Sequence, residues 1–123
     1  MSNHPIVHVE LAANNLEAAG KFYADLFGWK IESVPQFNYA TFEAKPGPGG
    51  GFVSVGGPSQ FKPGDVLIYI GTDDIDASLA KANQLGGKTI TPKSEIPGMG
   101  WYAIFSDPTG NKIGLYTDKN PHD

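Results

Sequence analysis

The sequence contains neither cysteine nor arginine among its 123 residues. Without cysteine there are no disulfides, no thiolate metal ligands and no cysteine nucleophile, and we expect a protein of the reducing cytoplasm. All nine basic residues are lysine. Because arginine is the usual bidentate clamp for carboxylate and phosphate groups, its absence disfavours nucleotides, phosphates and glutathione-type substrates as ligands.

Long hydrophobic runs and excess positive charge are also missing. No apolar stretch approaches the roughly 20 residues that a membrane-spanning helix needs, and no signal-peptide pattern opens the chain, so we expect no membrane partner. The net charge of −4 gives no electrostatic basis for binding nucleic acid. A hydrophobic content of 40% fits one compact globular domain.

An internal repeat with an offset of 59 residues organises the chain, since Val7 corresponds to Val66 and Leu26 to Leu85. A repeat of this length predicts two copies of one strand–helix–strands unit. We therefore expect a single domain over residues 1–123. Its predicted parts are module one at about 5–57, a linker near 56–60, module two at about 64–118 and a tail at 119–123.

Module one opens with a predicted strand at Ile6–Leu11, where apolar and polar residues alternate. Alternation turns Val7, Val9 and Leu11 toward a helix, and Ile6, His8 and Glu10 toward the opposite face. The helix has an Asn14 or Asn15 N-cap, ends at Gly28, and carries Ala19, Phe22, Tyr23 and Leu26 on its predicted inner stripe. Further strands are predicted at Trp29–Val34, Phe37–Ala44 and Gly51–Val55.

Module two repeats this order from its predicted strand Val66–Ile70. An Asp73 or Asp74 N-cap starts a helix whose predicted inner residues are Ile75, Leu79, Ala82 and Leu85. Strands are predicted near Lys88–Thr91, at Gly100–Phe105 and at Lys112–Tyr116, with a tight turn at Asp107–Gly110. Each module is therefore βαβββ, and the predicted fold class is α+β.

Three segments carry a family pattern: Val7-His8-Val9, the helix end Phe22–Trp29 and the turn-containing segment Phe105–Leu115. The pattern covers the chain from about Pro5 to Thr117 and resembles the vicinal oxygen chelate superfamily. That superfamily includes glyoxalase I, bleomycin-resistance proteins, extradiol dioxygenases and predicted enzymes related to lactoylglutathione lyase. The resemblance implies tandem βαβββ modules that form a curved mixed sheet around a cavity. It implies no particular activity, because these motifs build the fold.

The resemblance also implies where a metal would be held: glyoxalase-like members use four side chains from the first and last strands of the two modules. His8 stands at the first of these positions. The other three fall at Leu67, at Gly114 and at Gly51 or Ser54, none of which offers a carboxylate or an imidazole. We therefore expect no cofactor, with His8 as the only retained metal-ligand position, and no glyoxalase I reaction.

The sheet face away from the helices is the predicted pocket for a small, largely uncharged organic molecule. Its candidate ligand-binding residues are His8, Glu10, Phe52, Leu67, Tyr69, Trp101 and Tyr116. Strand register decides whether Trp101 or its neighbour Tyr102 points into this pocket. For each aromatic residue, sheet packing or a contact between subunits is the alternative role.

His8 and Glu10 lie two residues apart on one strand face, and they are also the candidate catalytic residues of an acid–base pair. Three functions thus stay open: a metal-independent binder similar to the bleomycin-resistance branch, a lyase- or isomerase-type enzyme, and a non-catalytic interaction module. The enzyme would act through His8 and Glu10 or through a rebuilt metal site. We expect a homodimer, since modules of the superfamily commonly pair across chains and open sheet edges need cover.

Overall fold

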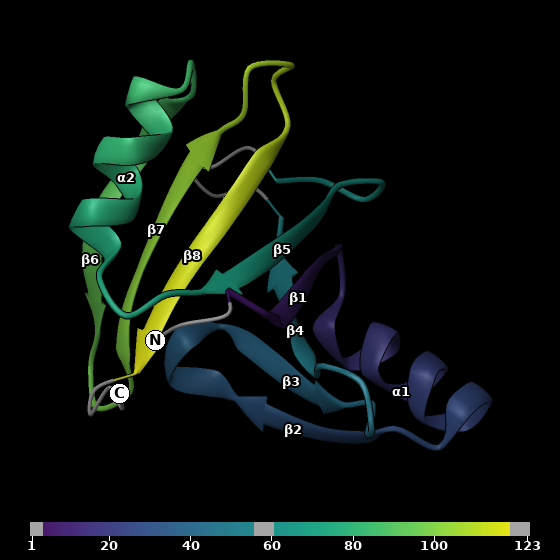
Figure 1. Ribbon diagram of the computed structural model, residues 1–123. Coiled ribbons are helices and arrows are strands. Elements are labelled where there is room, and N and C mark those ends of the chain that lie inside the picture. The colour runs from purple at the N-terminus through teal and green to yellow at the C-terminus, as the bar shows by residue number, and fades with distance from the viewer. Residues whose placement is uncertain (1–3, 56–60, 119–123) are drawn as a thin grey trace. The chain divides into compact units, whose positions relative to one another are not determined.

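A computed structural model describes residues 4–55 and 61–118 and shows two compact units (Figure 1). The first unit covers residues 8–67, and the second unit combines residues 68–118 with residues 4–7. Residues 4–7 join the second unit through Pro5, whose carbonyl oxygen accepts a 2.8 Å hydrogen bond from the backbone N–H of Gly71. The expected linker and the expected tail lie outside the described residues.

The first unit holds one helix and four strands, the first of which begins at Ile6, two residues before the boundary of the unit. In chain order these are β1 (Ile6–Ala13), α1 (Leu16–Phe27), β2 (Lys30–Val34), the short 3₁₀ helix η1 (Pro35–Phe37), β3 (Tyr39–Glu43) and β4 (Gly50–Ser54). The strand order is β2-β3-β4-β1, with β1 and β4 parallel and the other pairs antiparallel. The expected strand Phe37–Ala44 starts two residues late, because η1 takes up Phe37.

The second unit repeats the arrangement with β5 (Val66–Gly71), α2 (Ile75–Gln84), β6 (Lys88–Ile96), β7 (Gly100–Ser106) and β8 (Lys112–Asp118). Its strand order is β5-β8-β7-β6, with β5 and β8 parallel. The α+β class and the tandem βαβββ order are thus confirmed. Strand β6 runs five residues past the predicted end. It is the outer strand of this unit, where Pro92 and two register shifts are tolerated.

Both helices begin at the caps that the sequence predicts. The side chain of Asn15 accepts a 2.9 Å hydrogen bond from the N–H of Ala18, and Asp74 accepts one of 3.0 Å from Ala77. At the end of α1, Gly28 adopts φ +74°, and its N–H donates to the carbonyl oxygen of Ala24. A residue with a Cβ would be strained there, which explains the glycine.

Each unit buries its core between its helix and one sheet face. In the first unit Ala13, Ala40, Phe42 and Phe52 are buried, with Leu11, Leu16, Ala19, Tyr23, Trp29, Ile31 and Ala44 packed against them. Tyr23 of α1 stacks on Trp29 and on Phe52, with ring centroids 5.3 and 5.5 Å apart. In the second unit the core is Ile75, Leu79, Ala103 and Leu115, flanked by Ile70, Trp101 and Phe105.

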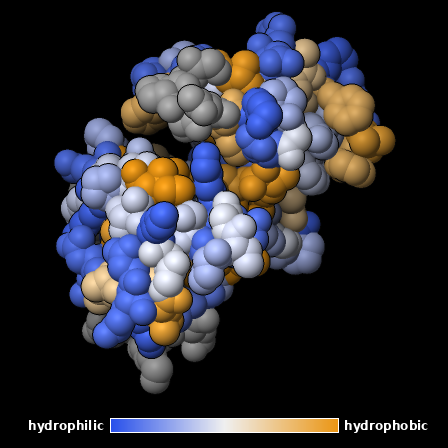
Figure 2. Space-filling view, turned by 90° about the horizontal axis from the view of Figure 1, so that it is seen from above, coloured by the Kyte–Doolittle hydropathy of each residue, from blue (hydrophilic) through white to orange (hydrophobic). Residues whose placement is uncertain are grey.

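Several residues assigned to the interior by periodicity are exposed. Leu26 is 57% and Leu85 70% exposed, and the other cases are Val7 and Phe22. The reason is that α1 packs mainly on β2, β3 and β4, and α2 on β6, β7 and β8. The flank of each helix turned away from these strands stays uncovered, and hydrophobic side chains are visible at the surface among hydrophilic ones (Figure 2).

The predicted turn at Asp107–Gly110 joins β7 to β8, and the Asp107 carboxylate organises it. It accepts hydrogen bonds of 2.9 Å from the backbone N–H groups of Thr109 and Asn111, and further bonds from both of their side chains. These bonds, led by the backbone N–H of Asn111, lower the pKa of Asp107 from 3.8 to about 2. The Asp107 carboxylate therefore stabilises the turn of the β7–β8 hairpin.

Gly50 provides a test of the close backbone approach between β1 and β4. A Cβ there would collide with the carbonyl oxygen of Val9 and lie 2.7 Å from the Phe42 ring. We expect Gly50→Ala to lower the free energy of unfolding by about 1–3 kcal/mol, as overpacking does. In Gly47→Ala the Cβ meets only the Ala44 carbonyl oxygen at 3.4 Å, so this control should change stability by less than about 0.5 kcal/mol. Urea unfolding measures the change in stability of each variant, and equal changes would contradict the close approach of β1 to β4 at Gly50.

Candidate functional site

His8 and Glu10 lie on the face of the first sheet that points away from α1. Strand register establishes this, because Leu11 pairs with the core residue Phe52, whereas Glu10 pairs with Gly51. Side chains alternate along β1, so His8 and Glu10 share one face and Leu11 lies on the other. We call this face of the first unit, opposite its core, the open face.

A tyrosine from another strand joins the two residues. The Tyr39 hydroxyl, on β3, lies 2.7 Å from His8 Nε2 and donates a 2.9 Å hydrogen bond to Glu10 Oε2. His8 Nε2 and Glu10 Oε2 are themselves 3.8 Å apart. The imidazole and phenol rings are nearly parallel, with an interplanar angle of 15° and centroids 6.4 Å apart. His8, Tyr39 and Glu10 therefore form one hydrogen-bonded trio.

Counting protons assigns the roles within the trio. A phenol has one O–H, and Tyr39 donates it to Glu10. In the Nε2–H tautomer of His8, the 2.7 Å contact is a donation from the imidazole to the Tyr39 oxygen. The side chains of His8 and Glu10 are only 33% and 16% exposed, so these bonds are partly shielded from water.

Burial also sets the charge of His8. Removal from water disfavours the imidazolium and lowers the pKa of His8 below its ordinary value of 6.5. At neutral pH the imidazole is therefore uncharged. A neutral imidazole close to a carboxylate is an arrangement that can take up a proton.

The residues present do not fit the four-ligand metal site of glyoxalase-like proteins. The Tyr39 ring and hydroxyl lie directly over Gly51, and the Tyr69 ring lies over Gly114, so that an added Cβ at either glycine would collide with a phenol. Tyrosine rings thus cover Gly114 and Gly51, the second of which is one of the two candidates, with Ser54, for the last-strand ligand position of module one. Among residues 4–55 and 61–118, no three or more His, Cys, Asp or Glu side chains gather as a metal site.

Three other candidate ligand residues, Leu67, Tyr69 and Tyr116, lie on the strand face opposite the core of the second unit. Tyr69 pairs with Gly114, and Tyr116 with Tyr102, while the core residues Leu115 and Ala103 lie between these rows. Leu67 shares the strand face of Tyr69, and both side chains are buried. The Tyr116 hydroxyl donates to the Asp118 carboxylate at 3.0 Å and lies 3.2 Å from the carbonyl oxygen of Met99. Burial, and then Asp118, raise the pKa of Tyr116 to about 12.

Two predicted ligand residues lie on the wrong face. Phe52 is 1% exposed and belongs to the core beneath α1. Trp101 packs against the core beneath α2, and the ammonium group of Lys93 lies 5.2 Å from the centroid of its ring. In both cases the register differs by one residue from the one assumed, which moves a side chain across the sheet. Tyr102 takes the position that we assigned to Trp101.

Sequence reasoning missed Tyr39. A signal existed, because a glycine inside a strand often marks the close approach of another group, and Gly51 and Gly114 are both such glycines. The signal does not reveal which side chain approaches. Tyr39 pairs with Val53 and reaches Gly51 diagonally, so pairing alone would not select it.

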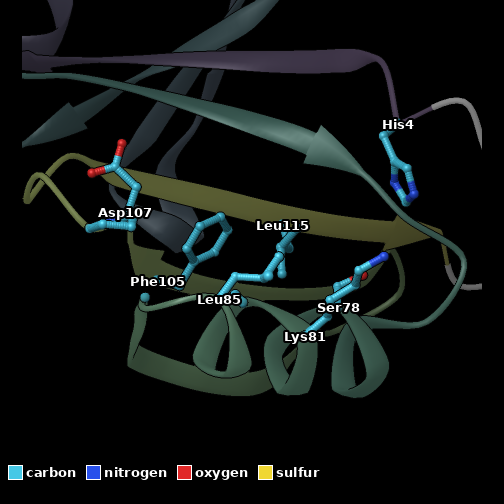
Figure 3. Close-up of a pocket in the computed structure, with 10 residues that line it drawn as sticks. His4, Ser78, Lys81, Leu85, Phe105, Asp107 and Leu115 are labelled. Carbon is cyan, nitrogen blue, oxygen red and sulfur yellow. The ribbon is translucent and has the colours of Figure 1, made fainter.

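Two hollows of the described residues lie elsewhere, on the helix sides of the units. One of about 350 Å³ runs beside α2, where Leu85, Phe105 and Leu115 line a groove with Lys81 near one end and Asp107 at the other (Figure 3). The second, of about 380 Å³, lies between α1 and residues Ile31 and Ala40. Neither is lined by the trio, so the cavity expected on the opposite face stays a prediction.

Comparison with known proteins identifies the family. The sequence model of the Glyoxalase/Bleomycin resistance protein/Dioxygenase superfamily matches residues 5–115. A glyoxylase-like domain-containing protein of Didymella fabae is 30% identical over 89% of this chain and 90% of its own length. The protein CFP32 of Mycobacterium bovis is 31% identical over 88% of this chain. The chain therefore belongs to this superfamily.

The match to CFP32 covers only 43% of that protein, so the chain spans less than half of its length. A superfamily member from Vibrio splendidus matches in structure with a TM-score of 0.67 at 13% identity, over 94% of this chain and 100% of the other. This likeness supports the fold. Neither helix among the described residues has the length and hydropathy needed to cross a bilayer.

The pKa of His8 makes a testable statement about stability. Its folded value lies below 6.5, so the unfolded chain binds the proton more readily. The contribution of neutral His8 should be fully present above pH 6.5 and should decline as the pH falls below it. NMR titration of the imidazole should give a midpoint under 6.5, with His8→Gln identifying the resonance. In that variant this part of the pH dependence of urea unfolding should vanish. A midpoint at or above 6.5 would contradict the lowering of the His8 pKa by burial.

Proposed function

We propose that this chain binds a small, largely uncharged organic molecule on its open face without a metal ion. One observation carries the proposal: tyrosine rings cover Gly51 and Gly114, where relatives of this fold would place metal ligands, and Tyr39 joins His8 to Glu10 instead. A partly buried polar trio on a sheet face can orient a ligand, and the surrounding surface then contributes apolar contact.

Charge favours a neutral ligand. The trio carries the Glu10 carboxylate, and the lowered pKa of His8 leaves its imidazole neutral. An anionic ligand would be repelled by that carboxylate, and no arginine is available to clamp it. The candidate residues Leu67, Tyr69 and Tyr116 stay a prediction for ligand contact on their own strand face, the one opposite the second core.

A second candidate function is acid–base catalysis by His8 and Glu10, as in a lyase or an isomerase. The observation that favours it is the trio itself, because a neutral imidazole backed by a phenol and a carboxylate can take a proton from a substrate. If the protein converts a bound ligand and His8→Ala abolishes this turnover, acid–base catalysis becomes the preferred function.

We further propose a cytoplasmic homodimer. Exposed Phe22 and Leu26 form an apolar flank on α1, and a second copy would remove that flank from water. Sedimentation of the purified chain measures the mass directly.

Metal content tests the first half of the proposal. Protein dialysed against Zn²⁺, Ni²⁺, Mn²⁺ and Fe²⁺ should retain no stoichiometric metal, because two ligands without a third bind weakly. Mass spectrometry of the metal-to-chain ratio gives the result, with His8→Ala as the matched variant. A ratio near one that falls in His8→Ala would show that a metal site has been rebuilt, and the proposal would be wrong.

A neutral and an anionic ligand of equal shape test the second half. Benzamide and benzoate differ mainly in charge, and we expect only benzamide to raise the melting temperature. A ligand at 100 times its Kd stabilises the native state by about 2.7 kcal/mol. His8→Ala should weaken the effect, whereas Phe37→Ala, at an exposed residue outside the trio, should leave it unchanged. A larger rise in melting temperature with benzoate than with benzamide would contradict the preference for a neutral ligand.

A further inference from the structure

Strand β2 lies at the outside of the sheet of the first unit (Figure 1). Within the part of the chain that the structure describes, β2 pairs with β3 alone, so its other edge presents a row of backbone N–H and C=O groups to a further strand. The edge of β6 is interrupted by Pro92 and by register shifts. In contrast, β2 contains no proline and keeps one register with β3 from Lys30 to Val34. A strand can therefore add to β2.

The side chains of β2 alternate between the two faces of the sheet. Ile31 pairs with the core residue Phe42 and so lies on the helix side. Lys30 and Glu32 lie on the open face, and both are exposed. Charged side chains on an edge strand usually discourage strand addition. Here the two charges are opposite and two residues apart, so an antiparallel copy of the same strand can place each lysine opposite a glutamate.

Face matching and charge together select one register. Residues directly opposite each other in an antiparallel pair share a face, so a copy whose helix lies on the same side must be centred on a residue. A centre at Lys30 or at Glu32 places like charges opposite each other, and a centre at Ser33 extends the pairing into η1. A centre at Ile31 pairs Lys30 with Glu32 of the other copy twice. We propose that a second copy of this chain adds its β2 to this edge in the register centred on Ile31.

The two α1 helices leave room for this seam between the copies. Helix α1 packs on β2, β3 and β4 and is thus centred near β3. Strand β3 and its counterpart in the second copy would be three strand spacings apart, about 14 Å. A helix with its side chains is about 10–12 Å wide, so the two helices would lie side by side without collision. The hollow of about 380 Å³ lies beside β2, and the long side chains of Glu17 and Lys21 that line it can span the remaining gap.

The seam is a different surface from the apolar flank of α1. Gly20 lies against Ile31 of β2. Phe22 follows two residues later, about 200° around the helix, so Phe22 and Leu26 point away from the seam. The proposal is independent of the ligand-binding function. Because the flank can also join two copies, the mass of an assembly does not by itself identify the seam, and the tests must probe β2.

Disulfide cross-linking tests the register, because the chain has no cysteine of its own. Opposite Cβ atoms are about 5 Å apart, which a disulfide can bridge, whereas diagonal neighbours at about 7–8 Å are beyond its reach. An equimolar mixture of Lys30→Cys and Glu32→Cys chains should therefore cross-link on mild oxidation, as seen by non-reducing electrophoresis. Each variant alone should stay uncross-linked.

The control for cross-linking is a mixture of Glu43→Cys and Glu32→Cys chains. Glu43 is exposed on the same face but lies on β3, opposite Lys30, which puts it about 10 Å from Glu32 of the second copy. This mixture should not cross-link. Cross-linking of Glu32→Cys with itself would show a copy centred on Glu32 and overturn the register. Absence of any cross-link in the Lys30→Cys and Glu32→Cys mixture would overturn the seam, and a dimer found in that case would have to use another surface.

Charge exchange tests the ion pairs across the seam. Lys30→Glu and Glu32→Lys each place like charges opposite each other, and each should weaken self-association about tenfold or more. An equimolar mixture of the two variants regains opposite charges at both pairs and should associate as the wild type does. Lys112→Glu, at an exposed residue of β8, matches the charge change of Lys30→Glu away from β2. Sedimentation equilibrium gives the dissociation constants. Equal constants for the wild type, both variants and their mixture would overturn the ion pairs, as would an equal loss in Lys112→Glu.

Discussion

The site depends on the absence of a side chain at Gly51. Only a bare backbone at this position on β4 lets the Tyr39 ring lie flat enough over the sheet for its hydroxyl to reach β1. The Tyr39 hydroxyl then contacts both the Glu10 carboxylate and the His8 imidazole, whose nearest polar atoms are 3.8 Å apart. The chemistry of the open face is therefore decided by a glycine that makes no polar side-chain contact at all.

The second unit uses the same arrangement with a different outcome. Tyr69 lies over Gly114, directly across the β5–β8 pairing, whereas Tyr39 reaches Gly51 diagonally from β3. No histidine or carboxylate stands at the position of His8 in the second copy, where the residue is Leu67. In both copies a tyrosine ring thus covers a glycine of the neighbouring strand, and in the first copy this tyrosine also contacts His8 and Glu10.

The fold and the faces of β1 were predictable from the sequence, and the contacts across strands were not. The offset of 59 residues and the caps Asn15 and Asp74 are local signals, and both led to the correct βαβββ order. Phe52 and Trp101 were placed on the wrong face, because a strand has a side-chain period of two and an error of one residue reverses it. Tyr39 was missed for a related reason: its partner is 29 residues away, and no periodicity connects them.

The outer strand of the second unit affects how this protein can assemble. An unpaired strand edge offers a continuous row of N–H and C=O groups on which another chain can add a strand. In β6 that row is broken by Pro92, which has no N–H, and by register shifts on either side of Thr91. Strand addition is therefore disfavoured at this edge, because the row is not continuous. Any association of two copies must use side chains and not backbone pairing at β6.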